Sequence, residues 1–453
     1  MAWTRGWWLG ALALVVGACP DGDSSPANMS APGAVDTGDA TTSPDVSLDS
    51  GPADDSGGCV PGNQGCACLE GACIGGLFCV EDECALGPQV EVDEGREVIA
   101  GLVVPVSADV MAEEFSWTQA GGPTVEILGA TTLEIAVVLP TDIAAGEVVT
   151  LRLTALRNSV TVEADVELTI IDETFEDFLS GVEDPAELGT PDGIDFDAAG
   201  MWVVSNEGFV SLFDGEGTLL QSYPMSGAPA GANFSGENLI IANREVGSPR
   251  VDQLNSVSGN VSNLFSLDAE GPGEVELPLP DTSGNVYVST GVGGRVLRWD
   301  AKRTTTSEFL SETDVLDPGA MAFGPEGNAI YVGGSGMVWR VPLLEGGMAG
   351  EPETYLELDA TCRVEGLVFD EGSSLWVGCP DTETLVLARY SAEGPTEVRR
   401  SWSAPAAGRS RFNNLHFGRG QVEGRWLYWT NLADGSVGRL VVGVSELDAP
   451  LAN

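Results

Sequence analysis

Short runs of alternating apolar and polar residues occupy the chain between residues 88 and 173. A period of two residues is typical of strands that bury one face, and the turn residues between the runs favour antiparallel pairing. About seven strands in a segment of this length predict a sandwich of two sheets. The clearest runs are residues 90–92, 115–117, 125–127, 133–135, 149–153 and 166–170.

A longer unit repeats across residues 175–453. Each copy joins an anchor residue to a turn and then to an apolar strand that often contains Trp or Tyr. Successive anchors are 38, 43, 46, 46 and 48 residues apart, which is the length of a four-stranded propeller blade. The repeats therefore predict a six-bladed β-propeller. The anchors are Phe196, Phe234, Leu277, Phe323, Phe369 and Phe417.

The last copy has only three readable strands and ends near Val442. A blade has four strands, and an unpaired edge would be a liability for the fold. We expect the segment from Phe175 to Leu179, which precedes the first copy, to supply the missing strand and close the ring. The predicted fold class is therefore all-β: a six-bladed β-propeller preceded by a β-sandwich and a small disulfide-rich module.

The N-terminus has the features of an export signal. Residues 1–18 combine Arg5 with an apolar run from Trp7 to Val16, too short to cross a hydrocarbon core of ~30 Å but typical of a signal peptide. The sequence up to Cys19 resembles a bacterial lipobox, which implies lipid on that cysteine; the alternative is an ordinary signal peptide with an incidental cysteine. Residues 20–58 hold eight Asp and no basic residue, so 19–58 is predicted to be a lipidated cysteine plus a disordered acidic linker.

Cysteines are concentrated in residues 59–86. A module this short cannot form a sufficient apolar core, so we expect three disulfides, whose pairing the sequence does not decide. A zinc site is the alternative, but neither CxxC pairs nor His occur there. The two remaining cysteines, Cys362 and Cys379, flank a predicted hairpin and are expected to form a further disulfide rather than two buried thiols. The clustered residues are Cys59, Cys66, Cys68, Cys73, Cys79 and Cys84.

Charge and composition narrow the range of functions. The chain has 20 basic and 69 acidic side chains, a formal net charge of -49, which argues against nucleic acid as a partner. A single histidine, His416, removes the usual Ser-His-Asp and Cys-His nucleophile systems. His416 alternates with Leu415 and Phe417, so we expect it to pack between blades rather than to act in catalysis.

Two segments resemble known modules that precede propellers. The stretch around Trp117, Gln119, Gly122-Pro123 and Val125 resembles PKD-like domains, an immunoglobulin-like family, so residues 88–173 are expected to be a PKD/Ig-like β-sandwich. Such a segment serves as a rigid spacer or binds glycans. The cysteine module resembles those that follow the tether in myxobacterial surface lipoproteins.

The propeller repeats resemble the SMP-30/gluconolactonase and strictosidine-synthase-like propellers. The best match is the last blade, where residues 414–418, 427–431 and 435–437 resemble the family's closing F-G-G, L-Y-V-T and G-S-V-Y segments. The resemblance implies a divalent cation, often Ca²⁺, held by a Glu, an Asn and an Asp at one mouth of the channel. In that family the metal polarises a lactone carbonyl and activates water.

Only part of this ligand set is present in the chain. The family's Glu falls on Asp192 and its Asp on Glu365, both carboxylates, while its fourth-blade Asn falls on Gly319, which has no side chain. Asn414, with Asn413 beside it, offers a further oxygen in the last blade. The resemblance therefore implies a Ca²⁺ site formed by Asp192, Glu365 and Asn414, and the substitution at Gly319 puts that site in doubt.

These observations favour a lipid-anchored protein of the bacterial cell envelope, at the outer membrane or cell surface, with the propeller over residues 175–453. We expect the propeller to bind a glycan, a peptide or a partner protein without being an enzyme. The alternative is a divalent-metal-dependent lactone hydrolase that uses Asp192 and Glu365. A third possibility is a structural adhesin, which would lack a defined pocket at the channel.

Overall fold

The computed structural model describes residues 64, 66–69, 73, 77–180, 188–267, 274–291, 294–302, 304–392, 396–403 and 412–447. Residues 1–58 and 59–453 form separate units, and the first unit lies outside the described residues. The signal peptide, Cys19 and the acidic linker therefore lie outside them too. None of the helices in the described part of the chain combines the length and apolarity that a membrane span needs.

A hairpin and disulfides hold the cysteine module together. Strands β1 (Leu77–Val80) and β2 (Glu83–Leu86) pair antiparallel. Cys68 bonds to Cys79 and Cys73 bonds to Cys84, so each bridge ties a preceding loop to the hairpin. Cys66 is also disulfide-bonded, and Cys59 lies outside the described residues. The module is therefore stabilised by disulfides, as its cysteine content predicted.

The predicted sandwich consists of two four-stranded sheets, ordered β4-β10-β9-β6 and β3-β5-β8-β7. Alternating apolar residues of both sheets form the core, in which Trp117 is only 2% exposed. The immunoglobulin-like prediction for this segment is confirmed at the level of fold. The strands are β3 (Gln89–Val92), β4 (Arg96–Val98), β5 (Val103–Met111), β6 (Glu114–Gly121), β7 (Glu126–Leu128), β8 (Glu134–Val138), β9 (Val148–Arg157) and β10 (Val160–Ile170).

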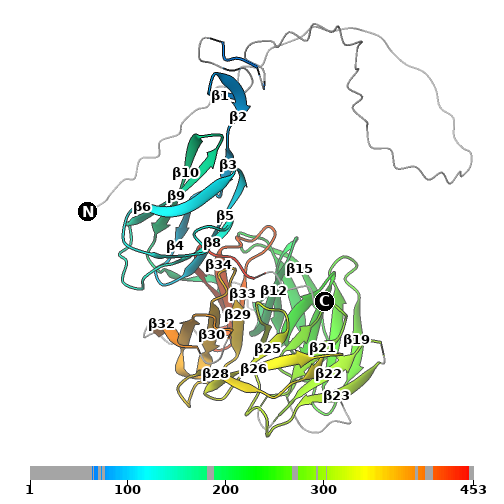
Figure 1. Cartoon of the computed structure of the whole chain (residues 1–453). Coiled ribbons are helices and arrows are strands. Elements are labelled where there is room, and N and C mark those ends of the chain that lie inside the picture. The colour runs from blue at the N-terminus through cyan, green and yellow to red at the C-terminus, as the bar shows by residue number, and fades with distance from the viewer. Residues whose placement is uncertain are drawn as a thin grey trace, which may run out of the picture. The chain divides into compact units, whose positions relative to one another are not determined.

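The rest of the described chain forms six antiparallel sheets, the blades of a β-propeller, coloured green to red in Figure 1. Blade 1 contains β12 (Pro191–Asp197), β13 (Gly200–Ser205), β14 (Phe209–Phe213) and β15 (Leu219–Pro224). Blade 2 contains β16 (Pro229–Ser235), β17 (Asn238–Asn243), β18 (Arg250–Asn255) and β19 (Val261–Ser266). Blade 3 contains β20 (Pro278–Pro280), β21 (Val286–Ser289), β22 (Val296–Asp300) and β23 (Thr305–Leu310).

The remaining blades complete the ring. Blade 4 contains β24 (Met321–Phe323), β25 (Ala329–Gly334), β26 (Met337–Leu344), β28 (Glu353–Glu357) and the short β27 (Met348–Ala349). Blade 5 contains β29 (Gly366–Phe369), β30 (Leu375–Cys379), β31 (Thr384–Ala388) and β32 (Val398–Ser403), with a 3-10 turn η1 (Pro380–Thr382) after β30. Blade 6 contains β33 (Asn413–Phe417), β34 (Trp426–Asn431), β35 (Ser436–Val441) and β11 (Phe175–Ser180).

Strand β11 closes the propeller as the sequence predicted. It precedes blade 1 in the chain but pairs antiparallel with β35, where Phe175 lies opposite Leu440. The last blade thereby gains its fourth strand and leaves no open edge at that position.

One anchor was assigned to the wrong residue. In five blades the predicted aromatic anchor pairs with the first or second residue of the next strand, as Phe369 pairs with Leu375. In blade 3 the position is taken by Pro280, opposite Val286, and the predicted anchor Leu277 lies just before β20. The error arose because proline interrupts the apolar pattern that marks the other anchors.

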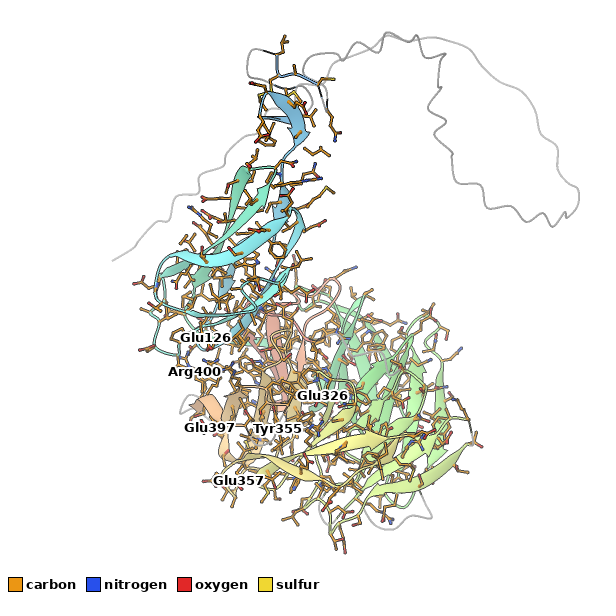
Figure 2. All side chains as sticks on the ribbon, viewed as in Figure 1. Glu126, Glu326, Tyr355, Glu357, Glu397 and Arg400 are labelled. Carbon is orange, nitrogen blue, oxygen red and sulfur yellow. A yellow bond between two sulfur atoms is a disulfide. The ribbon has the colours of Figure 1, made fainter. Side chains whose placement is uncertain are left out.

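The sandwich shares its core with blades 5 and 6 rather than standing apart as a spacer. One apolar cluster includes Ile99 of the sandwich and Trp376 and Trp429 of the propeller. The backbone N–H of Ile99 donates to the carbonyl of Val442 at 3.1 Å. Arg400 of β32, labelled in Figure 2, donates to the carbonyl of Ala100 at 3.1 Å. Burial of this cluster fixes the sandwich to the propeller.

Candidate functional site

The six inner strands line two cavities at opposite ends of their length. Residues at or just before the starts of these strands line the first cavity, and residues further along the same strands line the second. Because corresponding residues of all six inner strands take part in each, these cavities are the two mouths of one channel. We call them the arginine mouth and the histidine mouth. The first is lined by Asp192, Gly231, Arg244, Glu276, Leu277, Gly319, Ala320, Glu365, Asn413 and Asn414.

At the arginine mouth, the guanidinium of Arg244 lies between two carboxylates. Its Nη1 is 2.6 Å from Oδ2 of Asp192, and its Nη2 donates to Oε2 of Glu276. The Nε atom donates to the carbonyl of Val275 at 3.1 Å. Charge-assisted hydrogen bonds of this kind hold a planar guanidinium in one orientation. Arg244, which follows β17, therefore joins blade 2 to the inner strands of blades 1 and 3.

A second arginine extends this network to blade 5. Arg363 lies 3.0 Å from Glu276 and 2.9 Å from Glu365, so two arginines connect three carboxylates. Burial raises the pKa of Glu365 to about 7 despite the opposing effect of Arg363. Burial also raises the pKa of Asp192, although Arg244 acts in the opposite direction.

The network leaves almost no space for a ligand. The cavity at the arginine mouth measures about 20 Å³, which is room for about one water molecule. A cation bound to Asp192 would have to displace the guanidinium that already pairs with this carboxylate. The residues present therefore do not fit a resident divalent metal together with a lactone substrate.

The predicted metal ligands all lie at this mouth, but their contacts differ from a ligand set. Asp192 and Glu365 pair with arginines, and Asn414 Oδ1 accepts a hydrogen bond from the N–H of Ile194 at 3.2 Å. At Gly319, a Cβ atom would lie 2.4 Å from the carbonyl oxygen of Val364, so the backbone leaves no room for the missing ligand.

Sequence reasoning missed the residues that define this mouth. Arg244, Glu276 and Arg363 come from loops that lie at different blades. Their meeting depends on how the loops cross the channel, which no local spacing encodes. The only available signal was the rarity of basic residues, 20 in the whole chain.

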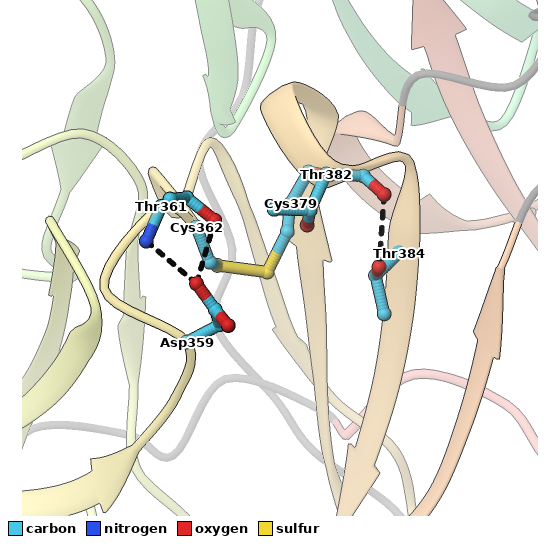
Figure 3. The surroundings of a disulfide bond; sticks show 6 residues. All are labelled: Asp359, Thr361, Cys362, Cys379, Thr382 and Thr384. Atoms are coloured by element: carbon cyan, nitrogen blue, oxygen red, sulfur yellow. Dashed lines mark hydrogen bonds between the residues drawn. A yellow bond between two sulfur atoms is a disulfide. The ribbon is translucent and has the colours of Figure 1, made fainter.

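A disulfide bond connects the loop before β29 to the end of β30 in blade 5, beside this network (Figure 3). Cys362, which directly precedes Arg363, is bonded to Cys379 at the end of β30. Thr361 donates to Oδ1 of Asp359 through its backbone N–H and its hydroxyl, which orders the turn before the bridge. The structure thus contains the pairing that the hairpin geometry predicted.

At the histidine mouth, one imidazole lies between two carboxylates. Nδ1 of His416 is 3.5 Å from Oδ1 of Asp195 and 3.9 Å from Oε2 of Glu446, and it has no hydrogen-bond partner. Arg419 is 2.9 Å from Oε1 of Glu446. The two carboxylates raise the pKa of His416 against the effect of its burial, and His416 and Arg419 lower the pKa of Glu446 against the effect of its burial.

Asp195 connects two inner strands at this mouth through hydrogen bonds to their backbone. Its two oxygens accept hydrogen bonds from the N–H groups of Phe196, at 2.7 Å, and Phe234, at 2.6 Å. It therefore links the inner strands of blades 1 and 2. Complete burial raises its pKa, while the nearby imidazole opposes that rise.

The position of His416 differs from our expectation. The strand alternation holds, because Leu415 and Phe417 enter the apolar core. His416 itself lines the channel cavity instead of packing between the blades. The histidine mouth has a cavity of about 130 Å³, lined by Asp195, Asn233, Phe234, Leu279, Pro280, Met321, Ala322, Phe323, Leu367, Val368, Phe369, His416, Arg419, Glu446 and Leu447.

The chain matches no protein-family model and no curated protein. Its fold is similar to several solved structures. A calcium-binding regucalcin from Agrobacterium tumefaciens is 15% identical, with a TM-score of 0.47, over 61% of this chain and 98% of that one. A gluconolactonase from Xanthomonas campestris is 13% identical, with a TM-score of 0.46, over 60% and 95%. An auxiliary nutrient binding protein from Bacteroides thetaiotaomicron is 12% identical, with a TM-score of 0.45, over 78% and 99%.

Proposed function

We propose that this chain is a lipid-anchored protein of the bacterial cell envelope whose propeller binds a ligand and catalyses no reaction. The observation that carries the proposal is the guanidinium of Arg244 between Asp192 and Glu276. It occupies the place where a cation would need those oxygens. A buried positive charge already satisfies the carboxylates, so a second positive charge has no unpaired partner to bind.

The proposal also rests on the lack of space and of suitable side chains for hydrolysis at the two mouths. The arginine mouth has room for about one water, and hydrolysis needs space for both substrate and attacking water. The one histidine of the chain lies at the other mouth, with its imidazole beside Asp195 and Glu446, and no Ser, Thr or Cys is among the residues that line that cavity.

A metal-dependent lactonase remains the second candidate, because Asp192, Glu365 and Asn414 do lie at one mouth. For such an enzyme, Ca²⁺ would be held by these oxygens and would polarise the lactone carbonyl. The candidate requires Arg244 to leave its two carboxylates.

Calcium titration of the full chain by calorimetry separates the two candidates. We expect only weak, diffuse binding to the acidic surface, unchanged in Asp192→Asn and Glu365→Gln. Glu357→Gln, at an exposed glutamate of β28, is the matched control for the general loss of charge. Saturable binding of one ion that both mouth variants abolish, together with hydrolysis of δ-gluconolactone, would refute the binding-protein proposal.

The anchor is tested separately. Palmitate labelling in a bacterial host should mark the wild-type chain and leave the Cys19→Ser variant unlabelled. Equal labelling of both chains would contradict lipidation at Cys19.

A further inference from the structure

Residues 443–447, which we call the strap, run along the histidine mouth from blade 6 to blade 5. Just before the strap, the N–H of Val442 donates to the carbonyl of Arg425 at 3.1 Å, next to β34. At its far end, the N–H of Leu447 donates to the carbonyl of Phe369 in β29 at 3.0 Å. Two residues of the strap are among those that line the cavity. The strap therefore forms part of the wall of the histidine mouth.

The backbone of the strap has few partners. The N–H of Glu371, in the turn after β29, donates to the carbonyl of Ser445 at 2.7 Å, and Leu447 makes the contact to Phe369. These are the two backbone hydrogen bonds of residues 445–447 to the described part of the chain. Strands within the blades are instead paired along their length. Segments with so few contacts open locally at a lower free energy than a packed sheet does.

The turn that receives the strap is held from its other side. The carboxylate of Glu371 pairs with Arg96 of the sandwich at 2.6 Å. A Cβ atom on Gly372 would lie 1.8 Å from the carbonyl oxygen of Val103, so this turn packs directly against the sandwich. If the contacts between turn and strap break, the strap is therefore the part that moves.

Glu446 supplies the strongest attachment of the strap. Its Oε1 is 2.9 Å from the guanidinium of Arg419, and its Oε2 is 3.9 Å from Nδ1 of His416 and accepts the N–H of Phe417 at 3.4 Å. Burial raises the pKa of Glu446, but His416 and Arg419 outweigh burial and lower it, so the carboxylate is charged at neutral pH. Hydrogen bonds to a charged group contribute more than neutral ones. Loss of this charge would leave the strap mainly with its two backbone hydrogen bonds.

From this arrangement we propose that the strap closes the histidine mouth reversibly and that the ionic contact of Glu446 with Arg419 and His416 keeps it closed. With the strap in place, His416 is only 9% exposed and Asp195 only 4%. Release of the strap connects the cavity of about 130 Å³ with solvent and gives a ligand its way in. The proposal thus adds a route of access to the proposed binding function, while the movement itself does not depend on which ligand binds.

Hydrogen exchange of the full chain, followed by mass spectrometry at residue level, tests what holds the strap. In Glu446→Gln, which removes the charge and keeps the shape of the side chain, the amides of Glu371 and Leu447 should exchange at least about tenfold faster than in the wild type. The amide of Val442, which lies before the strap, should keep its rate. Glu423→Gln removes an exposed carboxylate on the loop before β34 and is the matched control, with no change expected at any of these amides.

A second variant approaches the same contact from the other partner. Arg419→Gln removes the guanidinium that pairs with Glu446, and its side chain is 43% exposed, so the fold should tolerate the change. The amides of Glu371 and Leu447 should again exchange faster, and the amide of Val442 should again keep its rate. Agreement between the two variants assigns the effect to the ionic contact rather than to either side chain.

The single histidine reports whether the cavity opens. Diethyl pyrocarbonate modifies neutral imidazole, so its reaction with His416 is measured well above the imidazole midpoint determined for each protein. We expect His416 to react at least about tenfold faster in Glu446→Gln than in the wild type and in Glu423→Gln, because the reaction follows the population of the open form.

Three results would overturn the proposal: unchanged exchange of Glu371 and Leu447 in Glu446→Gln, equal acceleration at Val442, which would mean that the whole blade opens, or equal reactivity of His416 in all three proteins. None of them depends on the calcium titration. Saturable calcium binding with lactone hydrolysis would refute the proposed function and leave the strap results standing. A strap that fails these tests would leave ligand binding by the propeller intact.

Discussion

The two mouths of the propeller channel neutralise their buried carboxylates with different basic side chains. Both bring buried carboxylates close to the axis and both supply basic side chains to them. At the arginine mouth Asp192, Glu276 and Glu365 each pair with a guanidinium. The cavity that remains there measures only about 20 Å³. At the histidine mouth an imidazole lies between two carboxylates, and a cavity of about 130 Å³ stays open beside it.

The difference shows why acidic residues at a channel do not by themselves indicate a metal site. Arg244 provides the positive charge internally, and long arginine side chains also fill the space that a hydrated ion needs. Imidazole is shorter than the arginine side chain, so His416 contacts two carboxylates and still leaves a cavity beside it. Side-chain length and shape decide which mouth stays open.

The largest effect is expected from the disulfide beside the arginine mouth. Cys362→Ser with Cys379→Ser frees a loop with a sequence separation of 17 and should lower the free energy of unfolding by about 3 kcal/mol. Denaturant unfolding with and without reductant measures it. The NMR signal of His416 in the native state should not move, because the bridge lies beside the arginine mouth and His416 lines the other mouth. Equal stability of the bridged and unbridged chains would contradict the prediction.

For Arg244→Ala we expect a smaller decrease in the free energy of unfolding, of about 2 kcal/mol. The substitution leaves Asp192 and Glu276 buried without their partner, and Arg244 is 24% exposed, which moderates the loss. The vacated mouth exposes carboxylate oxygens, so millimolar Ca²⁺ should raise the melting temperature of this variant more than that of the wild type.

The matched control for Arg244→Ala is Arg152→Ala, which removes an exposed ion pair with Asp165 in the sandwich. We expect a much smaller loss of stability than for Arg244→Ala, because solvent screens the exposed pair, and no selective response to Ca²⁺. If Ca²⁺ stabilised all three proteins equally, the guanidinium would not be what excludes cations from the mouth.

The smallest expected effect is the pH dependence of stability that comes from His416 and Glu446 at the histidine mouth. The imidazole titration should have its midpoint above 6.5: burial and Arg419 lower the pKa of His416, but Asp195 and Glu446 raise it by more. A raised histidine pKa gives stability that is complete below the unfolded value of about 6.5 and is lost as pH rises through the folded value. For Glu446, whose pKa is lowered, the contribution is present above about 4.5 and is lost as pH falls.

The measurement for this prediction is the pH titration of the single histidine signal. Glu446→Gln removes one of the two facing carboxylates and should lower the midpoint of the imidazole titration. Glu423→Gln, on the loop before β34 and absent from the cavity-lining residues, serves as the control. An unchanged midpoint in Glu446→Gln would mean that Asp195 alone controls the imidazole.

Much of the fold was predictable because it follows from local periodicity. The repeating anchors gave the six blades, the short last copy gave the closure by β11, and the flanking positions gave the disulfide between Cys362 and Cys379. The exception, Leu277 in place of Pro280, occurred where proline broke the pattern. Periodicity reports which face of a strand is buried, and that information is local.

The candidate site was only partly predictable for the same reason. Asp192, Glu365 and Asn414 were correctly brought to one mouth, since blade repeats place corresponding residues together. What these oxygens contact depends on Arg244 and Arg363, which reach them from neighbouring blades.

The amino-acid sequence by itself determined the strands, the number of blades, the strand that closes the ring and the disulfide between Cys362 and Cys379, because these follow from alternation and spacing. Only the tertiary structure decided that one mouth is filled by arginine and that the other holds an imidazole between two carboxylates beside a cavity. Which charges meet across the channel depends on loops from different blades, and the free energy of a charge depends on its burial and on those partners. Neither quantity can be read from the spacing of residues along the chain.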